Sequence, residues 1–227
     1  THSIRWALAT LALATLLPSL GSSIANIALP TLAASFATSF DAVRWVVLAY
    51  LIAMTVAMVF AGQLGDRFGR RRLLVVGLVV ITAASVVGSA APSLWLVVAA
   101  RALQGIGAAI VVALSIAFVG ETVPRERTGR AMGLLGAMSA LGTALGPSLG
   151  GALVEAFGWR SIFLANVPIG LVAIALARRH LPSARPTSKV GGKLLDHLSG
   201  LLAPFRDRHL RASLTANLLV SAVLMAT

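Results

Sequence analysis

One arginine lies inside a long apolar segment of the sequence, where a charge is energetically expensive. Arg101 is the single charged residue of the run 94–120, about seven residues from the end at Leu94. At 1.5 Å per residue, this places it roughly 10 Å inside a helix. A charge at that depth usually faces a water-filled cavity or a partner, and a structural arginine instead bonds carbonyls or snorkels outward. Gln104 and Gly105 share the helix face of Arg101, and both interpretations remain open.

A second group of charged residues lies between two apolar runs. The segment 62–72 contains Asp66 and Arg70 between the uncharged runs 45–65 and 73–91. Each run is long enough to cross a hydrocarbon core, which needs about 20 apolar residues. We therefore expect a short polar turn at a membrane surface, in which Asp66 and Arg70 can form a pair if the turn is helical.

The composition excludes an ordinary soluble domain. The 227 residues are 58% hydrophobic and 11% charged, with a mean hydropathy of +0.91, whereas soluble domains are about 25% charged. The net charge of +12 does not indicate a nucleic-acid partner, because the basic residues lie in loops between apolar spans rather than on one polar face. The sequence shows no metal-ligand spacing and no phosphate-binding loop, so we expect neither an enzyme nor a cofactor.

Apolar segments divide the chain into six membrane spans, a linker and the start of a seventh span. Residues 1–178 contain the six spans, 179–211 form a basic linker, and 212–227 begin the seventh span. The six spans are expected at about residues 6–29, 44–65, 73–91, 94–120, 131–154 and 161–177. Because the chain begins with Thr1 and ends within an apolar run, we expect a fragment of a longer protein.

The distribution of basic residues predicts the orientation in the membrane. Sixteen of the nineteen Lys and Arg residues lie on one side of the six spans, whereas Arg44 and Arg160 lie on the other and Arg101 lies inside a span. Basic residues are enriched in cytoplasmic loops. We therefore expect a multi-pass protein in the lipid bilayer of the inner (cytoplasmic) membrane, with its N-terminus and linker in the cytoplasm.

The charged segment has an internal counterpart 89 residues further along the chain. Segments 62–71 and 151–160 share the pattern G-x-L-x-acid-x-F-G-x-R, with Glu155 in the second copy where the first has Asp66. The copies end the second and fifth spans on opposite sides, as a 3+3 inverted repeat would require. We expect Glu155, supported by Arg160, to help close the outer gate, although a solvated loop acid is the simpler alternative.

The fifth predicted span has a motif suited to bending or close packing. Gly142, Gly146 and Gly150 recur every four residues, and Gly151 follows them. Pro147 lies between them and should bend the helix because it removes a backbone donor. Tight packing against another helix would explain the same glycines.

The first, second and fourth spans carry side chains suited to a substrate cavity. The first has a polar stripe after Pro18, and the second stacks an aromatic residue and two adaptable methionines one turn apart. Helix-to-helix hydrogen bonds and plain lipid contact are alternative explanations of these two patterns. The candidate cavity residues are Ser22, Asn26, Tyr50, Met54, Met58 and Gly105.

Together these motifs resemble those of the major facilitator superfamily. Segment 62–72 resembles its G-x-L-a-D-r-x-G-r-r signature, 97–109 its fourth-helix motif, and 144–151 its fifth-helix motif associated with antiporters. Segments 26–30 and 158–170 narrow the resemblance to drug/proton antiporters of the EmrB/QacA type. These motifs follow one another over most of the six predicted spans.

The resemblance implies an all-α polytopic membrane protein, here the N-terminal six-helix bundle of the major facilitator fold plus the start of a seventh helix. It implies proton-driven export of hydrophobic, often cationic small molecules by alternating access, together with a missing C-terminal half. The alternatives are a facilitator or symporter for a small metabolite, or a non-transporting or degenerate half-transporter.

The resemblance also assigns roles to single residues. It implies that Arg101, with Gln104 in the same motif, serves proton coupling, and that Asp66, with Arg67 and Arg70, belongs to a conformational latch. The chain departs from the family at Gly21, where an Asp is common. That departure places the recognition of cations in question.

Overall fold

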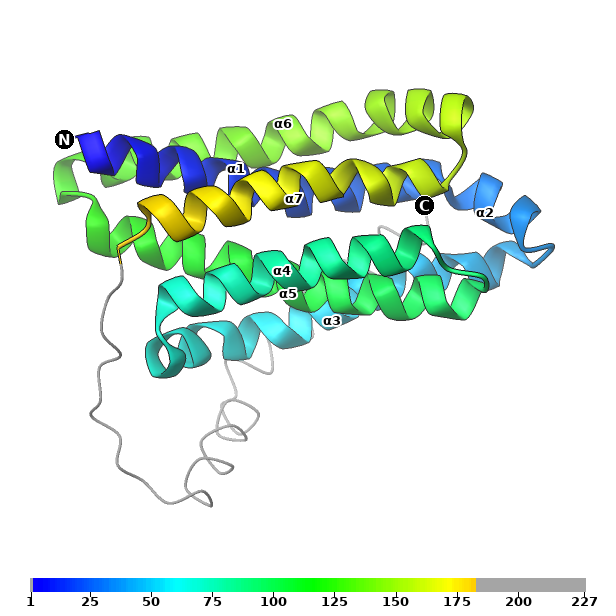
Figure 1. Ribbon diagram of the computed structural model, residues 1–227, viewed down its shortest axis with the longest axis horizontal. Coiled ribbons are helices and arrows are strands. Elements are labelled where there is room, and N and C mark those ends of the chain that lie inside the picture. Colours follow the sequence, from blue (N-terminus) through cyan, green and yellow to red (C-terminus); the bar gives the residue numbers. More distant parts are fainter. Residues whose placement is uncertain (1, 183–227) are drawn as a thin grey trace, which may run out of the picture.

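The computed structural model describes residues 2–182, which form seven helices joined by short connections (Figure 1). The predicted linker beyond residue 182 and the start of the seventh span lie outside the described residues. Six of the seven helices are long and apolar enough to cross a membrane. The helices are α1 (His2–Ile27), α2 (Leu29–Ser35), α3 (Phe40–Phe68), α4 (Arg70–Ser89), α5 (Leu94–Thr122), α6 (Arg125–Phe157) and α7 (Arg160–His180).

The expected turn between the second and third spans is shorter than the sequence suggested. Helix α3 continues through Asp66 to Phe68, and α4 begins at Arg70, so Gly69 alone separates them. Gly69 has a φ of 88°, a conformation that side chains with a Cβ rarely adopt. Asp66 and Arg70 therefore lie on either side of the turn at which the chain passes from α3 to α4.

The short helix α2 is a second difference from the sequence analysis. The first span was expected to continue to about residue 29, but α1 ends at Ile27 and a new helix starts two residues later with Pro30 in its first turn. Proline is favoured there because the first helical amides need no intrahelical acceptor. Leu29 and Leu32 are buried, and α2 packs against α3.

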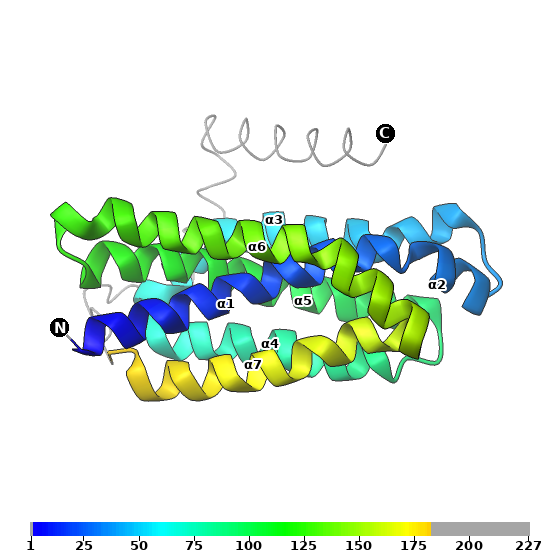
Figure 2. The same ribbon diagram turned by 90° about the horizontal axis from the view of Figure 1, so that it is seen from above.

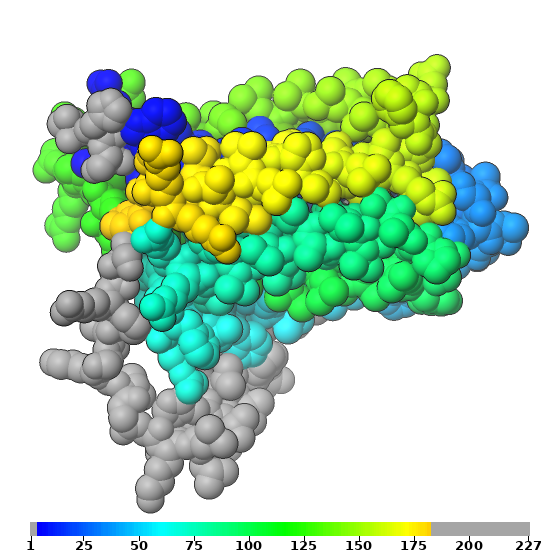
Figure 3. Space-filling view, in the orientation of Figure 1, coloured from blue at the N-terminus to red at the C-terminus, as the bar shows by residue number. Residues whose placement is uncertain are grey.

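Helices α1 and α5 form the centre of the bundle, with α3 and α6 on one side and α4 and α7 on the other (Figure 2). In the most apolar windows of α1 and α5, 61% of the residues are buried, compared with 22% in α3 and 17% in α6. The outer face of α4 and α7 is seen as two parallel bands in Figure 3. Much of α3 and α6 is therefore left open to lipid or to another part of the protein.

The contacts between helices repeat in a way that supports the inverted repeat. In the repeat, α1, α3 and α4 correspond to α5, α6 and α7. Helix α1 packs against α6 and α7 of the second set, and its counterpart α5 packs against α3 and α4 of the first set. Helix α4 packs against its own counterpart α7. The counterparts Gly69 and Gly158 both have positive φ, 88° and 76°, and each lies between two long helices. Figure 1 shows these two turns at opposite ends of the bundle.

Small residues allow the helix backbones to approach closely. A Cβ added at Gly107 would lie 2.7 Å from the carbonyl oxygen of Gly77, so α4 and α5 touch there by backbone. At Gly105 an added Cβ would overlap the carbonyl oxygen of Tyr50 in α3. Packing of this kind drives helix association in lipid, where hydrophobicity does not favour one apolar neighbour over another.

Helix α6 changes direction in its second half (Figure 2). Pro147 lies inside this half. Proline removes a backbone donor and its ring clashes with the preceding turn, so it bends the helix that contains it. The bend brings the end of α6 over to the start of α7 at Arg160.

We predict that Gly105→Ala lowers the thermal stability of the protein in detergent. The added methyl group meets backbone rather than a movable side chain, and overpacking of this kind costs about 1–3 kcal/mol. Gly133→Ala is the matched control, because nothing lies within 4 Å of its added Cβ. The control should keep or raise the unfolding temperature, since alanine favours helix more than glycine does. Equal unfolding temperatures for the two variants would contradict the packing described for α3 and α5.

Candidate functional site

Arg101 lies in the middle of the bundle and is only 2% exposed. Its Nε donates to the carbonyl of Val46 in α3 at 3.3 Å, and its Nη1 donates to the carbonyl of Gly21 in α1 at 3.4 Å. Nη1 also donates to Oε1 of Gln104 at 2.8 Å. The guanidinium lies over the ring of Tyr50, 4.2 Å from its centroid, where the negative face of the ring attracts a cation.

Gln104 extends these contacts to a fourth helix. Its Nε2 donates to Ser85 in α4 at 2.7 Å, and the Ser85 hydroxyl donates to the carbonyl of Ile81 at 2.8 Å. On the other side, the Tyr50 hydroxyl donates to the carbonyl of Pro18 in α1 at 3.2 Å. We call Arg101, Gln104, Ser85 and Tyr50 the Arg101 network. It connects α1, α3, α4 and α5.

The Arg101 side chain bonds carbonyl groups inside the bundle instead of snorkelling outward. Backbone carbonyls can accept a second hydrogen bond because each has two lone pairs. They solvate the guanidinium without neutralising it, and its Nη2 has no hydrogen-bond partner among the described residues. The network is thus a polar site that keeps a net positive charge.

A second charge cluster lies where α3, α4 and α5 meet. Arg70 donates from Nε and Nη2 to Oδ1 of Asp66, at 3.0 and 2.8 Å, and from Nη1 to Oε1 of Glu121, at 2.8 Å. Asp66 and Glu121 lie in the last turns of α3 and α5, where the helix dipole disfavours an acid. We call these three residues the Arg70 cluster. Arg70 offsets the negative charge of both helix ends.

The other residues expected in gates are not joined to this cluster. Arg67 lies over the ring of Phe68, and Arg160 lies over the ring of Trp159, 4.4 Å from its centroid. Glu155 is exposed. None of the ion pairs within residues 2–182 involves Glu155, so Glu155 and Arg160 are not paired in this structure, and their joint role at the outer gate stays a prediction.

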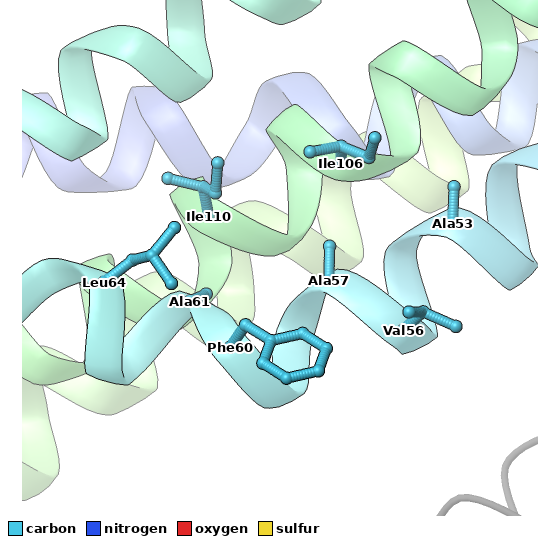
Figure 4. Close-up of a pocket in the computed structure, with 8 residues that line it drawn as sticks. All are labelled: Ala53, Val56, Ala57, Phe60, Ala61, Leu64, Ile106 and Ile110. Carbon is cyan, nitrogen blue, oxygen red and sulfur yellow. The ribbon is translucent and has the colours of Figure 1, made fainter. Parts of the chain in front are cut away.

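The candidate cavity residues differ in their exposure within this half of the bundle. Tyr50 is buried, Met54 is partly buried and Met58 is exposed, because residues four apart drift by about 40° around a helix of 3.6 residues per turn. Gly105 packs against the α3 backbone. A pocket of about 260 Å³ between α3 and α5 is lined by apolar side chains, among them Phe60 and Ile106, and by none of the six candidates (Figure 4).

The polar stripe of α1 divides into two groups. Ser19 and Ser23 bond to α6, through the Ser139 hydroxyl at 2.6 Å and the Thr143 carbonyl at 2.8 Å. Ser22 donates to its own helix at the carbonyl of Ser19, and Asn26 is exposed. Helix-to-helix bonding therefore explains half of the stripe, and Ser22 and Asn26 stay candidates for the cavity.

The glycines of α6 belong to the same interface. Added Cβ atoms at Gly142, Gly146 and Gly150 would press against Leu16, Ser23 and Ile24 of α1. Gly151 has no neighbour within 4 Å of its added Cβ. Close packing of α1 and α6 accounts for the first three glycines, while Pro147 accounts for the bend.

Sequence reasoning missed Ser85 and Glu121. Ser85 is one of several small polar residues in apolar spans, and nothing in its sequence context distinguishes it. Glu121 offered a weak signal, since it follows the fourth span on the side that carries Asp66. Tyr50 was expected at a cavity, and its contact with Arg101 depends on the register of α3 against α5, which spacing does not fix.

The fold is that of a polytopic helical membrane protein. The family model described as "Major Facilitator Superfamily" matches residues 11–227. This chain belongs to the major facilitator superfamily, and the expected six-helix bundle of that fold is confirmed.

Known relatives agree with this assignment. The chain is 38% identical over 183 residues to the riboflavin transporter RibZ of Clostridioides difficile, covering 81% of the chain and 40% of that protein. It is 40% identical over 158 residues to the multidrug resistance protein Stp of Mycobacterium tuberculosis, covering 69% of the chain and 29% of that protein. Relatives named for drug resistance confirm the resemblance to drug/proton antiporters, and the chain spans well under half the length of these relatives.

A solved structure shows the same fold. The crystal structure of a D-xylose–proton symporter superimposes with a TM-score of 0.71 at 19% identity, covering 92% of this chain and 55% of that one. At this identity the similarity establishes the architecture only.

We predict that Gln104→Leu destabilises the protein more than Ser85→Ala does. Leucine fills most of the space but leaves the Arg101 Nη1 without its short acceptor, and a lost bond to a buried charged group costs about 1.5–3 kcal/mol. Ser85→Ala removes only the outer end of the network. Thermal unfolding in detergent measures both variants, and a smaller loss for Gln104→Leu would show that Gln104 contributes little to holding Arg101.

Proposed function

We propose that this chain forms the first six-helix half of a transporter that exports hydrophobic small molecules across the cytoplasmic membrane in exchange for protons. The observation that carries the proposal is the buried, charged Arg101 network at the centre of the bundle. A charge in a span is costly and is typical of transport pathways. Relatives named for multidrug resistance support export.

The role of Arg101 in coupling follows from its chemistry. An arginine does not lose its proton in proteins, so it acts as a fixed charge rather than as a proton carrier. It can lower the proton affinity of a nearby acid or hold a negative group. No acid of residues 2–182 lies in the middle of a span. The proton would therefore bind to a group outside these residues or to the substrate.

The Arg70 cluster is the proposed latch. It joins the ends of α3 and α5 to the start of α4, and its ion pairs must rearrange if these ends separate. Arg67 and the repeat-related pair Glu155 and Arg160 remain proposed gate residues at the two ends of the bundle. The helix bend at Pro147 and the cavity residues Ser22 and Asn26 belong to the same proposal.

A second candidate function is uptake of a small metabolite by a facilitator or symporter. The relative named as a riboflavin transporter favours it. The two candidates differ in the direction of net substrate movement under an imposed proton gradient, which the following experiment measures.

We predict that Arg101→Ala in the full-length protein abolishes proton-driven export while the protein still inserts into the membrane. The measurement is loss of a fluorescent hydrophobic dye from cells or inverted vesicles under an imposed proton gradient. Arg72→Ala is the control, because it removes an exposed arginine at the start of α4.

Full dye export by Arg101→Ala would remove Arg101 from the mechanism. Proton-driven accumulation of a metabolite by the unaltered protein, without dye export, would favour the second candidate function.

We predict that Asp66→Asn and Glu155→Gln shift the conformational balance in opposite directions. Exposed ion pairs contribute at most about 1 kcal/mol, enough for roughly a fivefold change in a balanced equilibrium. The chain contains no Cys. A single Asn26→Cys can therefore report accessibility from each side of the membrane, provided that no cysteine occurs elsewhere in the full-length protein. Unchanged labelling in Asp66→Asn rejects the latch, and unchanged labelling in Glu155→Gln identifies Glu155 as a solvated acid.

A further inference from the structure

The Arg101 network leaves a positive charge without a counter-ion. The guanidinium bonds the carbonyls of Val46 and Gly21 and the amide oxygen of Gln104, all of which are neutral. Its Nη2 is buried and has no hydrogen-bond partner among residues 2–182. The Tyr50 ring offers only a partial negative charge.

None of the ion pairs among residues 2–182 joins an acidic residue to Arg101. Each acidic residue of the described chain lies in the first or last turn of a long helix, whereas Arg101 is two turns inside α5. These acids are Asp41, Asp66, Glu121, Glu126 and Glu155. A buried charge without a partner is strongly unfavourable, so the centre of the bundle attracts a negative group.

Of the residues that contact the Arg101 guanidinium, Gly21 is partly exposed, whereas Val46, Tyr50 and Gln104 are buried. Gly21 lies in α1, and its carbonyl oxygen lies 3.4 Å from Nη1 of Arg101. A Cβ added at Gly21 would have as its nearest neighbour Nδ2 of Asn166 in α7, at 3.3 Å. Asn166 is a flexible side chain whose Oδ1 has no partner among the described residues. A short side chain at position 21 would therefore fit after a small movement of Asn166.

We propose that Gly21 determines the charge class of the substrate. With no side chain at Gly21, the charge of Arg101 is left for the transported molecule, which we infer to be a hydrophobic anion, such as one bearing a carboxylate or an acidic phenol. A carboxylate at this position would instead neutralise Arg101 from within and remove the preference. This inference rests on the proposed function, because it names the class of molecule that the transporter carries.

Tetraphenylborate and tetraphenylphosphonium test the proposal, because they have nearly the same shape and opposite charges. Their binding to the purified full-length protein is measured by equilibrium dialysis, with detergent alone as the blank. The unaltered protein should bind the borate at least about tenfold more tightly than the phosphonium. Gly21→Asp should lower this affinity ratio by about tenfold or more relative to Gly21→Asn, which has the same size and no charge.

Asn166→Asp is an independent variant, because it adds a negative charge without changing the shape of the side chain. It should also lower the ratio of borate affinity to phosphonium affinity. It carries the test if Gly21→Asp does not fold. Equal affinities or a preference for the phosphonium in the unaltered protein would overturn the proposal, as would an unchanged ratio in the aspartate variants. A carboxylate supplied by residues beyond 182 would produce the first of these results.

The result is separable from the proposed function. Dialysis needs no proton gradient, so a protein that binds the anion but exports nothing would contradict proton-driven export and leave the charge preference standing. Proton-driven export with no charge preference would contradict this inference alone.

Discussion

The bundle is organised around the burial of one guanidinium among neutral oxygen atoms. Arg101 can remain charged at the centre only because α1 and α3 bring backbone carbonyls to it and Gln104 supplies a third acceptor. The close approach of α3 depends in turn on Gly105, whose missing side chain leaves room for the Tyr50 backbone. Gly105 and Arg101 lie on the same helix, α5. Gly105 lets α3 come close enough for the Val46 carbonyl to accept a hydrogen bond from Arg101.

The inverted repeat gives the two ends of the bundle similar backbone turns, at Gly69 and Gly158, but the side chains at the two ends differ. One end has the Arg70 cluster, with its two ion pairs. At the other end the ion pair of Arg44 with Asp41 lies within α3 and joins no second helix, and Arg160 lies over Trp159, which contacts Phe36 and Phe163. Ion pairs exchange readily with water, whereas an aromatic cluster separates at the expense of buried apolar area. The two ends therefore differ in how they would open.

Most of the architecture could be predicted from the sequence, because membrane spans follow from length and hydropathy and the repeat follows from Gly69 and Gly158. The pairing of Asp66 with Arg70 depended only on local spacing. Ser85, Glu121 and the contact of Tyr50 with Arg101 could not be predicted, since they depend on the register between helices distant in sequence. Spacing also grouped Tyr50 with Met58, although helical drift turns one into the core and the other outward.

The most direct test of the central claim is an experimental structure of the full-length protein without substrate, at a resolution that defines the Arg101 side chain. The account predicts the guanidinium against the carbonyls of Val46 and Gly21, over the Tyr50 ring, with no carboxylate within 4 Å, the distance that defines an ion pair. A carboxylate seated against Arg101 from any part of the protein would contradict the claim that its charge is held by neutral groups.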